Sequence, residues 1–291
     1  LYVQEGLDGD PKVLIDPNTW AKDGTIALAQ WVPSPDGRYL AYGIQDGGSD
    51  WRKWRILRVA DGKQLDDELE WLKFTSVSWL PDGSGFYYSR YPEPADGEEF
   101  QSLNLNMKLY FHKVGEAQSK DRLVYEDPAN PDWGYAGEVT EDGRYLVVTV
   151  WLGTDDRYQI LYQDLKDPDS QLQFLIKGFE SGYFLAGNDE ETLYFRTTNK
   201  APRSRVVEIN PKQPETIQWH EVVPETENVL QVAGIMGDSL VLEYLQDAKS
   251  ILQVNSLSGK LLHEVELPGV GSVGGFSGAA TEADAFFSFS S

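Results

Sequence analysis

The stretch Ser34-Pro35-Asp36-Gly37-Arg38-Tyr39-Leu40-Ala41-Tyr42 decides the fold, because it joins a tight turn to the start of a strand. Proline presets the backbone of the second residue of a turn, and glycine accepts the positive φ that follows. The aromatic and aliphatic residues after the turn are typical of a β-strand. We therefore predict an antiparallel hairpin at this position.

The same turn-and-strand motif recurs along the chain. Six copies carry an acidic residue in the turn, and neighbouring copies are 44 to 60 residues apart: Asp36, Asp82, Asp142, Asp189, Asp238 and Glu282. A repeat of this length is typical of β-propellers. A further strand is expected after each of the first five hairpins, at residues 54–59, 108–114, 159–165, 204–209 and 250–257. Each of these strands is expected to pair with one more strand, so that the hairpin and this second pair form a blade of four antiparallel strands. Blades bury their faces by stacking on one another. Residues 91–106 are predicted to be an exposed loop inserted between strands.

The two ends of the chain each supply half a blade. Strands are expected at residues 1–4 and 12–15, and another pair within residues 272–291. We predict an all-β, six-bladed propeller with a composite blade made by the two termini, because closure satisfies exposed strand edges. The alternative is an incomplete seven-bladed propeller. Residues 1–291 are expected to form a single domain, cut from a longer polypeptide.

Composition excludes several classes of function. There are 25 Lys and Arg against 47 Asp and Glu, so the formal net charge is −22. Such a chain repels phosphate backbones and anionic lipids, and we predict neither a nucleic-acid partner nor a membrane partner. Cysteine is absent, which excludes disulfides and thiolate metal sites. This fits a reducing compartment, so we expect a cytoplasmic protein, with the bacterial periplasm as the alternative.

Several separated motifs resemble the propeller of the prolyl oligopeptidase (prolyl endopeptidase) family. They occur in the family's order along nearly the whole chain: Leu14-Ile15-Asp16-Pro17-Asn18, Asp23-Gly24-Thr25, Gly48-Ser49-Asp50-Trp51, Leu72-Lys73-Phe74, Ser78-Trp79, Lys108-Leu109-Tyr110-Phe111-His112, Asp142-Gly143-Arg144-Tyr145 and Val270-Gly271-Ser272-Val273. The resemblance implies a non-catalytic propeller that caps an α/β-hydrolase serine peptidase domain. It also implies that the complete enzyme cleaves short proline-containing peptides after proline, and that the propeller gates their access. We expect no peptidase domain within residues 1–291, and six blades where the family has seven.

The resemblance also implies site residues. Phe74 matches a phenylalanine that lines the family's substrate cavity, although a place in the core of a blade is the alternative. The next two cavity positions fall on Gly134 and Thr154, where relatives often carry bulkier or sulfur-bearing residues. Asp50 matches an aspartate that pairs with a basic residue of the catalytic domain at the domain interface.

The residues themselves predict no catalysis by this chain alone. A serine hydrolase of the α/β type needs G-x-S-x-G, followed by an acid and then a histidine. Ser272 and Ser277 lack a complete elbow, and His112, His220 and His263 precede both. Each histidine is expected to be a partly exposed strand residue. No pair of them has metal-ligand spacing, so we predict no metal and no cofactor.

Two other classes of function remain as alternatives. A stand-alone propeller hydrolase of the glycosidase kind would place two carboxylates around its central funnel, but 47 acids give too many pairs to rank. A protein-interaction propeller of the WD-repeat kind would carry G-H and W-D dipeptides, and neither dipeptide occurs in this sequence.

Overall fold

A computed structural model describes residues 1–95, 97, 103–215, 218–278 and 284–291. These residues are almost entirely strands and turns, apart from the short 3-10 helices η1 (Pro17–Thr19) and η2 (Gln118–Lys120). The chain divides into two compact units, Leu1–Val139 and Thr140–Ser291. The single domain expected from the sequence stays a prediction.

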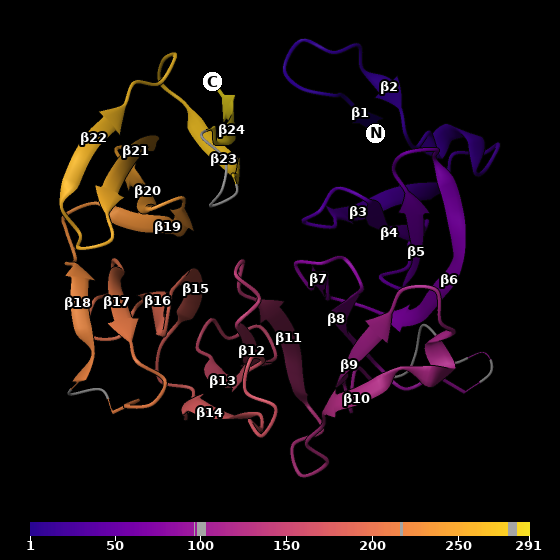
Figure 1. The fold of residues 1–291 in the computed structure, drawn as a ribbon, viewed down its shortest axis with the longest axis horizontal. Coiled ribbons are helices and arrows are strands. Elements are labelled where there is room, and N and C mark those ends of the chain that lie inside the picture. Colours follow the sequence, from indigo (N-terminus) through magenta and orange to yellow (C-terminus); the bar gives the residue numbers. More distant parts are fainter. Residues whose placement is uncertain (96, 98–102, 216–217, 279–283) are drawn as a thin grey trace. The chain divides into compact units, whose positions relative to one another are not determined.

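The first unit contains two antiparallel four-stranded sheets whose strands follow chain order (Figure 1). The first sheet has β3 (Ile26–Pro33), β4 (Tyr39–Asp46), β5 (Arg52–Arg58) and β6 (Lys63–Leu72). The second has β7 (Val77–Trp79), β8 (Gly85–Arg90), β9 (Lys108–Lys113) and β10 (Arg122–Tyr125). Before them, β1 (Tyr2–Val3) pairs with β2 (Lys12–Val13). Strand β11 (Trp133–Val139) ends the unit beside β7, β8 and β9.

The second unit also contains two four-stranded sheets, preceded by three strands and followed by a strand pair. Its first three strands are β12 (Tyr145–Leu152), β13 (Gln159–Asp164) and β14 (Gln173–Ile176). A four-stranded sheet follows, with β15 (Tyr183–Asp189), β16 (Thr192–Thr197), β17 (Arg205–Ile209) and β18 (His220–Val223). The next has β19 (Val229–Met236), β20 (Ser239–Gln246), β21 (Lys249–Ser256) and β22 (Leu261–Val265). The last pair is β23 (Ser272–Ser277) with β24 (Phe286–Ser290).

These strands agree closely with the sequence prediction. The five strands expected after the hairpins are confirmed as β5, β9, β13, β17 and β21, each within two residues at both ends. The all-β fold of repeated four-stranded blades is confirmed as well. The terminal pairs β1–β2 and β23–β24 form a separate two-stranded sheet each. A composite blade would join the two units, so it stays a prediction. The inserted loop at 91–106 falls partly outside the described residues, as does the sixth turn, at 281–282.

The three hairpin turns at Asp36, Asp82 and Asp142 have one geometry, set by the aspartate and the glycine. The carboxylates of Asp36, Asp82 and Asp142 each accept the backbone N–H two residues further on, at 2.9 to 3.0 Å. The glycine that follows each aspartate has a φ of +63° to +70°, a conformation that residues with a Cβ rarely adopt. The turn is therefore specified locally, before any contact between blades.

Neighbouring turns of the first unit also contact each other. The Arg38 guanidinium donates to the backbone carbonyl of Asp82. A Cβ added at Gly83 would lie 2.7 Å from a carboxylate oxygen of Asp36, whereas one added at Gly37 would meet nothing within 4 Å. In the second unit, Asn188 donates to Asp142 at 3.1 Å. The turns thus join successive sheets in addition to reversing the chain.

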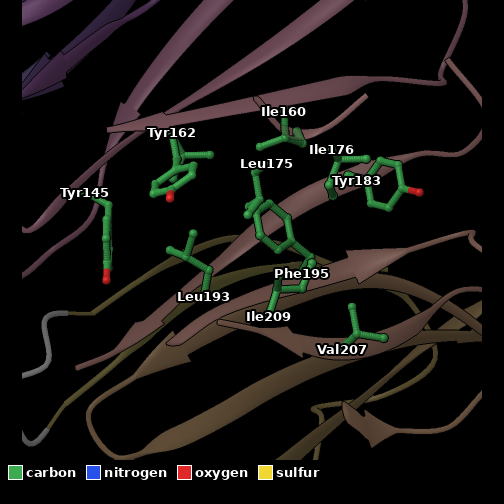
Figure 2. Packing of buried hydrophobic residues seen from close by; sticks show 11 residues of the cluster. Tyr145, Ile160, Tyr162, Leu175, Ile176, Tyr183, Leu193, Phe195, Val207 and Ile209 are labelled. Carbon is green, nitrogen blue, oxygen red and sulfur yellow. The ribbon is translucent and has the colours of Figure 1, made fainter. Parts of the chain in front are cut away.

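Apolar residues fill the space between sheets. In the second unit, one buried cluster takes side chains from β12, β13 and β14 and from β15, β16 and β17, and Figure 2 shows how they pack. We call this cluster the apolar junction; its buried members are Tyr145, Val147, Ile160, Tyr162, Leu175, Ile176, Tyr183, Leu193, Phe195, Val207 and Ile209. A comparable cluster in the first unit includes Trp54, Trp79 and Phe86. Stacking buries the faces that a single blade would leave exposed.

Candidate functional site

Phe74 is a solvent-exposed aromatic residue between β6 and β7. Its side chain is 55% exposed, so it is not a residue of a blade core. The Nζ of Lys73 lies 5.6 Å from the Phe74 ring centroid and 4.6 Å from that of Trp51. The Lys73 ammonium therefore lies within cation–π distance of both rings.

Trp51 is the centre of an aromatic cluster. Its ring meets Trp71 edge to face at 5.7 Å and Tyr91 edge to face at 6.1 Å. These geometries are the favourable ones for aromatic pairs. Together with Phe74 and Lys73, these residues form what we call the Trp51 cluster. Trp51 comes from the connection between β4 and β5, Trp71 from β6, Lys73 and Phe74 from the segment after β6, and Tyr91 from the start of the 91–106 insertion.

Asp50 lies directly before Trp51, after the turn that ends β4. It is exposed, and it takes part in no ion pair within the described part of the chain. The structure therefore brings two of the predicted site residues, Asp50 and Phe74, to the same aromatic cluster.

Two members of the cluster have strained backbones. Trp71 has a φ of +66° and Phe74 a φ of +57°. Bulky residues in this left-handed region are outliers, because the Cβ crowds the backbone. The carbonyl of Trp71 accepts the N–H of Tyr91 at 3.0 Å, which holds the strained segment to the neighbouring strand end. A strained backbone conformation persists only where the contacts of the surrounding structure hold it in place. Such conformations are frequent in segments that bind ligands.

A hollow adjoins the Trp51 cluster. Its volume is about 600 Å³, within the range of small-molecule and peptide-side-chain pockets. It is lined by three tryptophans, two isoleucines and several polar residues: Trp20, Ile26, Ile44, Asp46, Ser49, Trp51, Arg52, Lys53, Arg55, Glu70 and Trp71. This hollow was not among the features predicted from the sequence. The available signal was that Trp51 belongs to the motif containing Asp50 and that Trp71 immediately precedes the motif containing Phe74.

The other two predicted cavity residues lie elsewhere. Gly134 is buried in β11, in the first unit, next to Tyr135, whose N–H donates to the sulfur of Met107 at 3.2 Å. Thr154 is exposed in the turn after β12, in the second unit. Since the three predicted cavity positions are divided between the two units, their assembly into one cavity stays a prediction.

A second group of polar residues is fully buried between the two sheets of the first unit. His112 is 0% exposed, and its Nε2 and Nδ1 lie 3.0 Å from Asp67 and 2.7 Å from Asp121. Both nitrogens can donate only when the ring is an imidazolium. Tyr88 also donates to Asp121, at 2.7 Å, and the backbone N–H of Gly115 donates to Asp67 at 2.6 Å. We call this group the Asp–His–Asp clamp.

The clamp shifts the pKa of its histidine. Burial by itself lowers the pKa of His112, but the hydrogen bonds to Asp121 and Asp67 outweigh it and raise the pKa to about 9. The sequence prediction that His112 is partly exposed is wrong. His220 and His263, by contrast, are exposed strand residues, on β18 and β22.

The described part of the chain contains neither a metal-binding group nor a membrane-spanning helix. Within the described ranges, no group of three or more His, Asp or Glu is placed to hold a metal ion. Among the same residues, no helix has the length and apolarity that crossing a bilayer requires.

Comparison with known families agrees with the repeated blades. Residues 1–291 match the family described as the prolyl oligopeptidase N-terminal beta-propeller domain. The chain belongs to this family. Prolyl endopeptidase of Elizabethkingia miricola is 37% identical over 98% of this chain and 40% of its own length. Prolyl oligopeptidase A of Amanita bisporigera is 32% identical over 90% of this chain and 37% of its own length.

Solved structures of prolyl oligopeptidases have the same fold. One, from a study of two prolyl endopeptidases and their inter-domain dynamics, is 36% identical, with a TM-score of 0.86 over 97% of this chain and 40% of that one. Another, prolyl oligopeptidase B of Galerina marginata bound to a 25mer macrocyclization substrate, is 25% identical, with a TM-score of 0.87 over 98% of this chain and 41% of its own. The chain thus spans about 40% of the length of these prolyl oligopeptidases.

Proposed function

We propose that this chain is the non-catalytic propeller of a prolyl oligopeptidase-like serine peptidase, and that it caps the active site and admits only short peptides. The match of all 291 residues to the family's propeller carries the proposal. The chain alone is proposed to have no peptidase activity. An α/β-hydrolase peptidase domain is the proposed partner, and short proline-containing peptides are the proposed substrates of the complete enzyme.

The exposed residues near Trp51 suit contact with that partner. Asp50 is an exposed carboxylate outside the ion pairs of the described residues, so it can pair with a basic residue of the peptidase domain. Phe74 exposes an apolar ring beside it, which suits contact with a peptide side chain. Gly134 and Thr154 offer little side-chain area, so we propose a wider cavity at these two positions than a bulky residue would leave.

A chimera tests the gating proposal. The chain would replace the propeller of the Elizabethkingia miricola enzyme, and cleavage of a chromogenic proline peptide would be compared with cleavage of a large, unstructured protein. We expect the chimera to cleave the peptide and to spare the protein. Equal cleavage of both by the chimera would refute gating, and peptide cleavage by the 291-residue chain alone would refute its non-catalytic role.

Single substitutions in the chimera separate the two proposed site residues. Phe74→Ala is expected to raise KM for the peptide severalfold, since an apolar contact is lost, with little change in kcat. Leu123→Ala removes another exposed apolar side chain, on β10, and serves as the matched control. An unchanged KM in Phe74→Ala, or an equal rise in the control, would contradict the assignment of Phe74 to the substrate cavity.

A further inference from the structure

The hollow beside Trp51 lies on one face of the first sheet. Ile44 and Asp46 are two residues apart on β4, so their side chains point to the same face. Ile26 lies opposite Asp46 on β3 and shares that face. Three partly buried tryptophans complete the walls: Trp20, Trp51 and Trp71. A ligand group that covers these apolar surfaces therefore gains free energy.

Two cations on this face are already paired with carboxylates. Lys53 lies opposite Ile44, and its Nζ is 2.5 Å from a carboxylate oxygen of Glu70. Arg55 is two residues further along β5, and its Nη2 is 2.8 Å from a carboxylate oxygen of Glu68. Both charges are neutralised within the sheet, so neither gives the hollow a free positive charge.

Arg52 contributes to the lining of the hollow, but its guanidinium lies on the opposite face of the sheet. It pairs with Gln45, one position away from the cross-strand pair that contains Lys53. Its Nη1 donates to Gln30 at 2.9 Å, and Gln30 donates to Ser76 at 2.7 Å, just before β7. The Arg52 guanidinium is thus directed toward the second sheet and away from the hollow.

Asp46 is the charged residue of the hollow that lacks a partner among the described residues. It is exposed, and its carboxylate takes part in no ion pair or hydrogen bond within the described part of the chain. Lys73, whose ammonium lies against the Trp51 ring, is not part of the lining and donates to Asn104 at 3.2 Å. The hollow is therefore complementary to a group with one positive charge and an apolar body.

An arginine side chain fits these walls better than lysine or a neutral side chain. Tryptophan is the aromatic residue that attracts cations most strongly. The guanidinium is planar and weakly hydrated, so it stacks on aromatic rings, whereas the lysine ammonium is strongly hydrated. The chain itself makes such a contact in its second unit, where the Arg196 guanidinium lies 3.8 Å from the ring centroid of Phe184. A neutral side chain would leave Asp46 without a counter-charge.

We propose that this hollow binds an arginine side chain of a short peptide, with the guanidinium against the tryptophan rings and paired with Asp46. The aliphatic stem of the arginine lies against Ile26 and Ile44, and a hollow of about 600 Å³ has room for it. The left-handed backbone of Trp71 fits this role, because it fixes an aromatic ring in the wall. The choice of a peptide as the ligand rests on the proposed function, whereas the hollow lies wholly within the first unit.

Calorimetric titration of the 291-residue chain with three tripeptides tests the proposal. The probes are acetyl-Ala-Arg-Ala amide and its counterparts with citrulline or lysine in the middle, and their blocked ends carry no charge. The arginine peptide is expected to bind saturably. The citrulline peptide has nearly the same shape but no charge to pair with Asp46, so we expect it to bind about tenfold more weakly. The lysine peptide should also bind more weakly than the arginine peptide.

A pair of variants separates contact with Asp46 from the net charge of the chain. Asp46→Asn is expected to remove the preference for arginine over citrulline. Asp66→Asn removes the same charge from an exposed position on β6 of the same sheet, outside the hollow, and should keep the full preference. Circular dichroism of both variants checks that they are folded.

An aromatic variant gives a second, independent readout. Trp20→Leu is expected to weaken binding of the arginine peptide about tenfold, because one wall of the hollow is lost. Trp31→Leu is the matched control, since Trp31 is exposed on β3 and does not line the hollow. An unchanged affinity in Trp20→Leu, or an equal loss in Trp31→Leu, would contradict the proposed walls.

Three results of the titrations would overturn the proposal. These are an absence of saturable binding by the arginine peptide, equal affinity for the citrulline peptide, or the same loss of preference in Asp66→Asn as in Asp46→Asn. Equal affinity for the lysine peptide would refute the choice of arginine.

The gating chimera distinguishes this proposal from the proposed function, because its chromogenic proline peptide contains no arginine. If the chimera gates and the isolated chain does not bind the arginine peptide, the arginine site is refuted and gating stands. If the isolated chain binds the arginine peptide with the expected preference and the chimera fails to gate, the site stands and gating is refuted.

Discussion

The two units join neighbouring sheets in different ways. In the second unit, the apolar junction packs Phe195, Leu193 and Ile160 without ionisable groups in the buried cluster other than tyrosine hydroxyls. In the first unit, a comparable apolar cluster is accompanied by the Asp–His–Asp clamp, in which β6 supplies Asp67 and β9 supplies His112. Both junctions are buried, but only the clamp depends on a histidine proton. Burial alone therefore does not determine how a junction responds to pH.

Removing the cation of the clamp should produce the largest effect. His112→Leu leaves Asp67 and Asp121 buried without a positive partner, and breaking a buried charge pair costs about 3–5 kcal/mol. We expect a loss of stability of about that size in denaturant unfolding. His220→Leu is the matched control, because His220 is exposed, and it should cost less than about 0.5 kcal/mol. Equal stability of His112→Leu and the native chain would show that the clamp does not stabilise the junction.

The pH dependence of stability should be the next largest effect. The pKa of His112 is raised to about 9 in the folded chain, from an ordinary value near 6.5. Its contribution is therefore complete below about pH 6.5 and is lost as the pH rises through about 9, for a total of roughly 3 kcal/mol. Unfolding measured from pH 6 to pH 10 should show this fall, and His112→Leu should reduce it. A fall of equal size in His112→Leu would assign it to other groups.

Loss of the tyrosine hydroxyl should have a smaller effect. Tyr88 donates to Asp121 at 2.7 Å, and burial together with Asp121 raises the pKa of this phenol. Tyr88→Phe removes one hydrogen bond to a buried carboxylate, which is worth about 1.5–3 kcal/mol. We expect destabilisation of about 2 kcal/mol by thermal unfolding. The comparison is Tyr110→Phe, on β9, whose ring stacks on that of Tyr88 and whose hydroxyl does not bond Asp121. An equal loss there would mean that the contact with Asp121 is not responsible.

The smallest effect is expected at the apolar junction. Ile160→Val removes one buried methylene group and should cost about 1 kcal/mol. The cost should not change between pH 6 and pH 10, because the buried members of the cluster carry no group that titrates with the clamp histidine. Denaturant unfolding at both pH values measures this. A cost that varied with pH in the same way as the clamp would remove the distinction between the two junctions.

Local sequence specified the strands well and the site only in part. The Asp-Gly turns form within a few residues, so the hairpins at Asp36 and Asp82 could be predicted without knowledge of their neighbours. His112 was predicted to be partly exposed because it ends a strand. Its partner Asp67 lies 45 residues away on another sheet, and a contact of this separation leaves no local pattern.

The same reasoning explains what was found and missed near Trp51. Asp50 and Phe74 were predicted through family motifs, and the structure shows both exposed at the Trp51 cluster. Their functional roles stay predictions. The hollow was missed because it needs Trp20, from the segment before β3, beside Trp71, from the end of β6. The positive φ of Trp71 is equally invisible in the sequence, since tryptophan gives no signal for that conformation.

The contact between neighbouring turns has a consequence for how this repeat can change. Gly37 and Gly83 occupy equivalent positions in two copies of the turn-and-strand motif, and both have a positive φ. A side chain at Gly37 would meet open space, but one at Gly83 would collide with the carboxylate of Asp36. Mutational tolerance is therefore unequal at positions that look interchangeable. A library that treats the blades as identical modules, or a graft that exchanges their turns, should lose more variants at Gly83, where the contact with Asp36 adds to the backbone strain that both positions share.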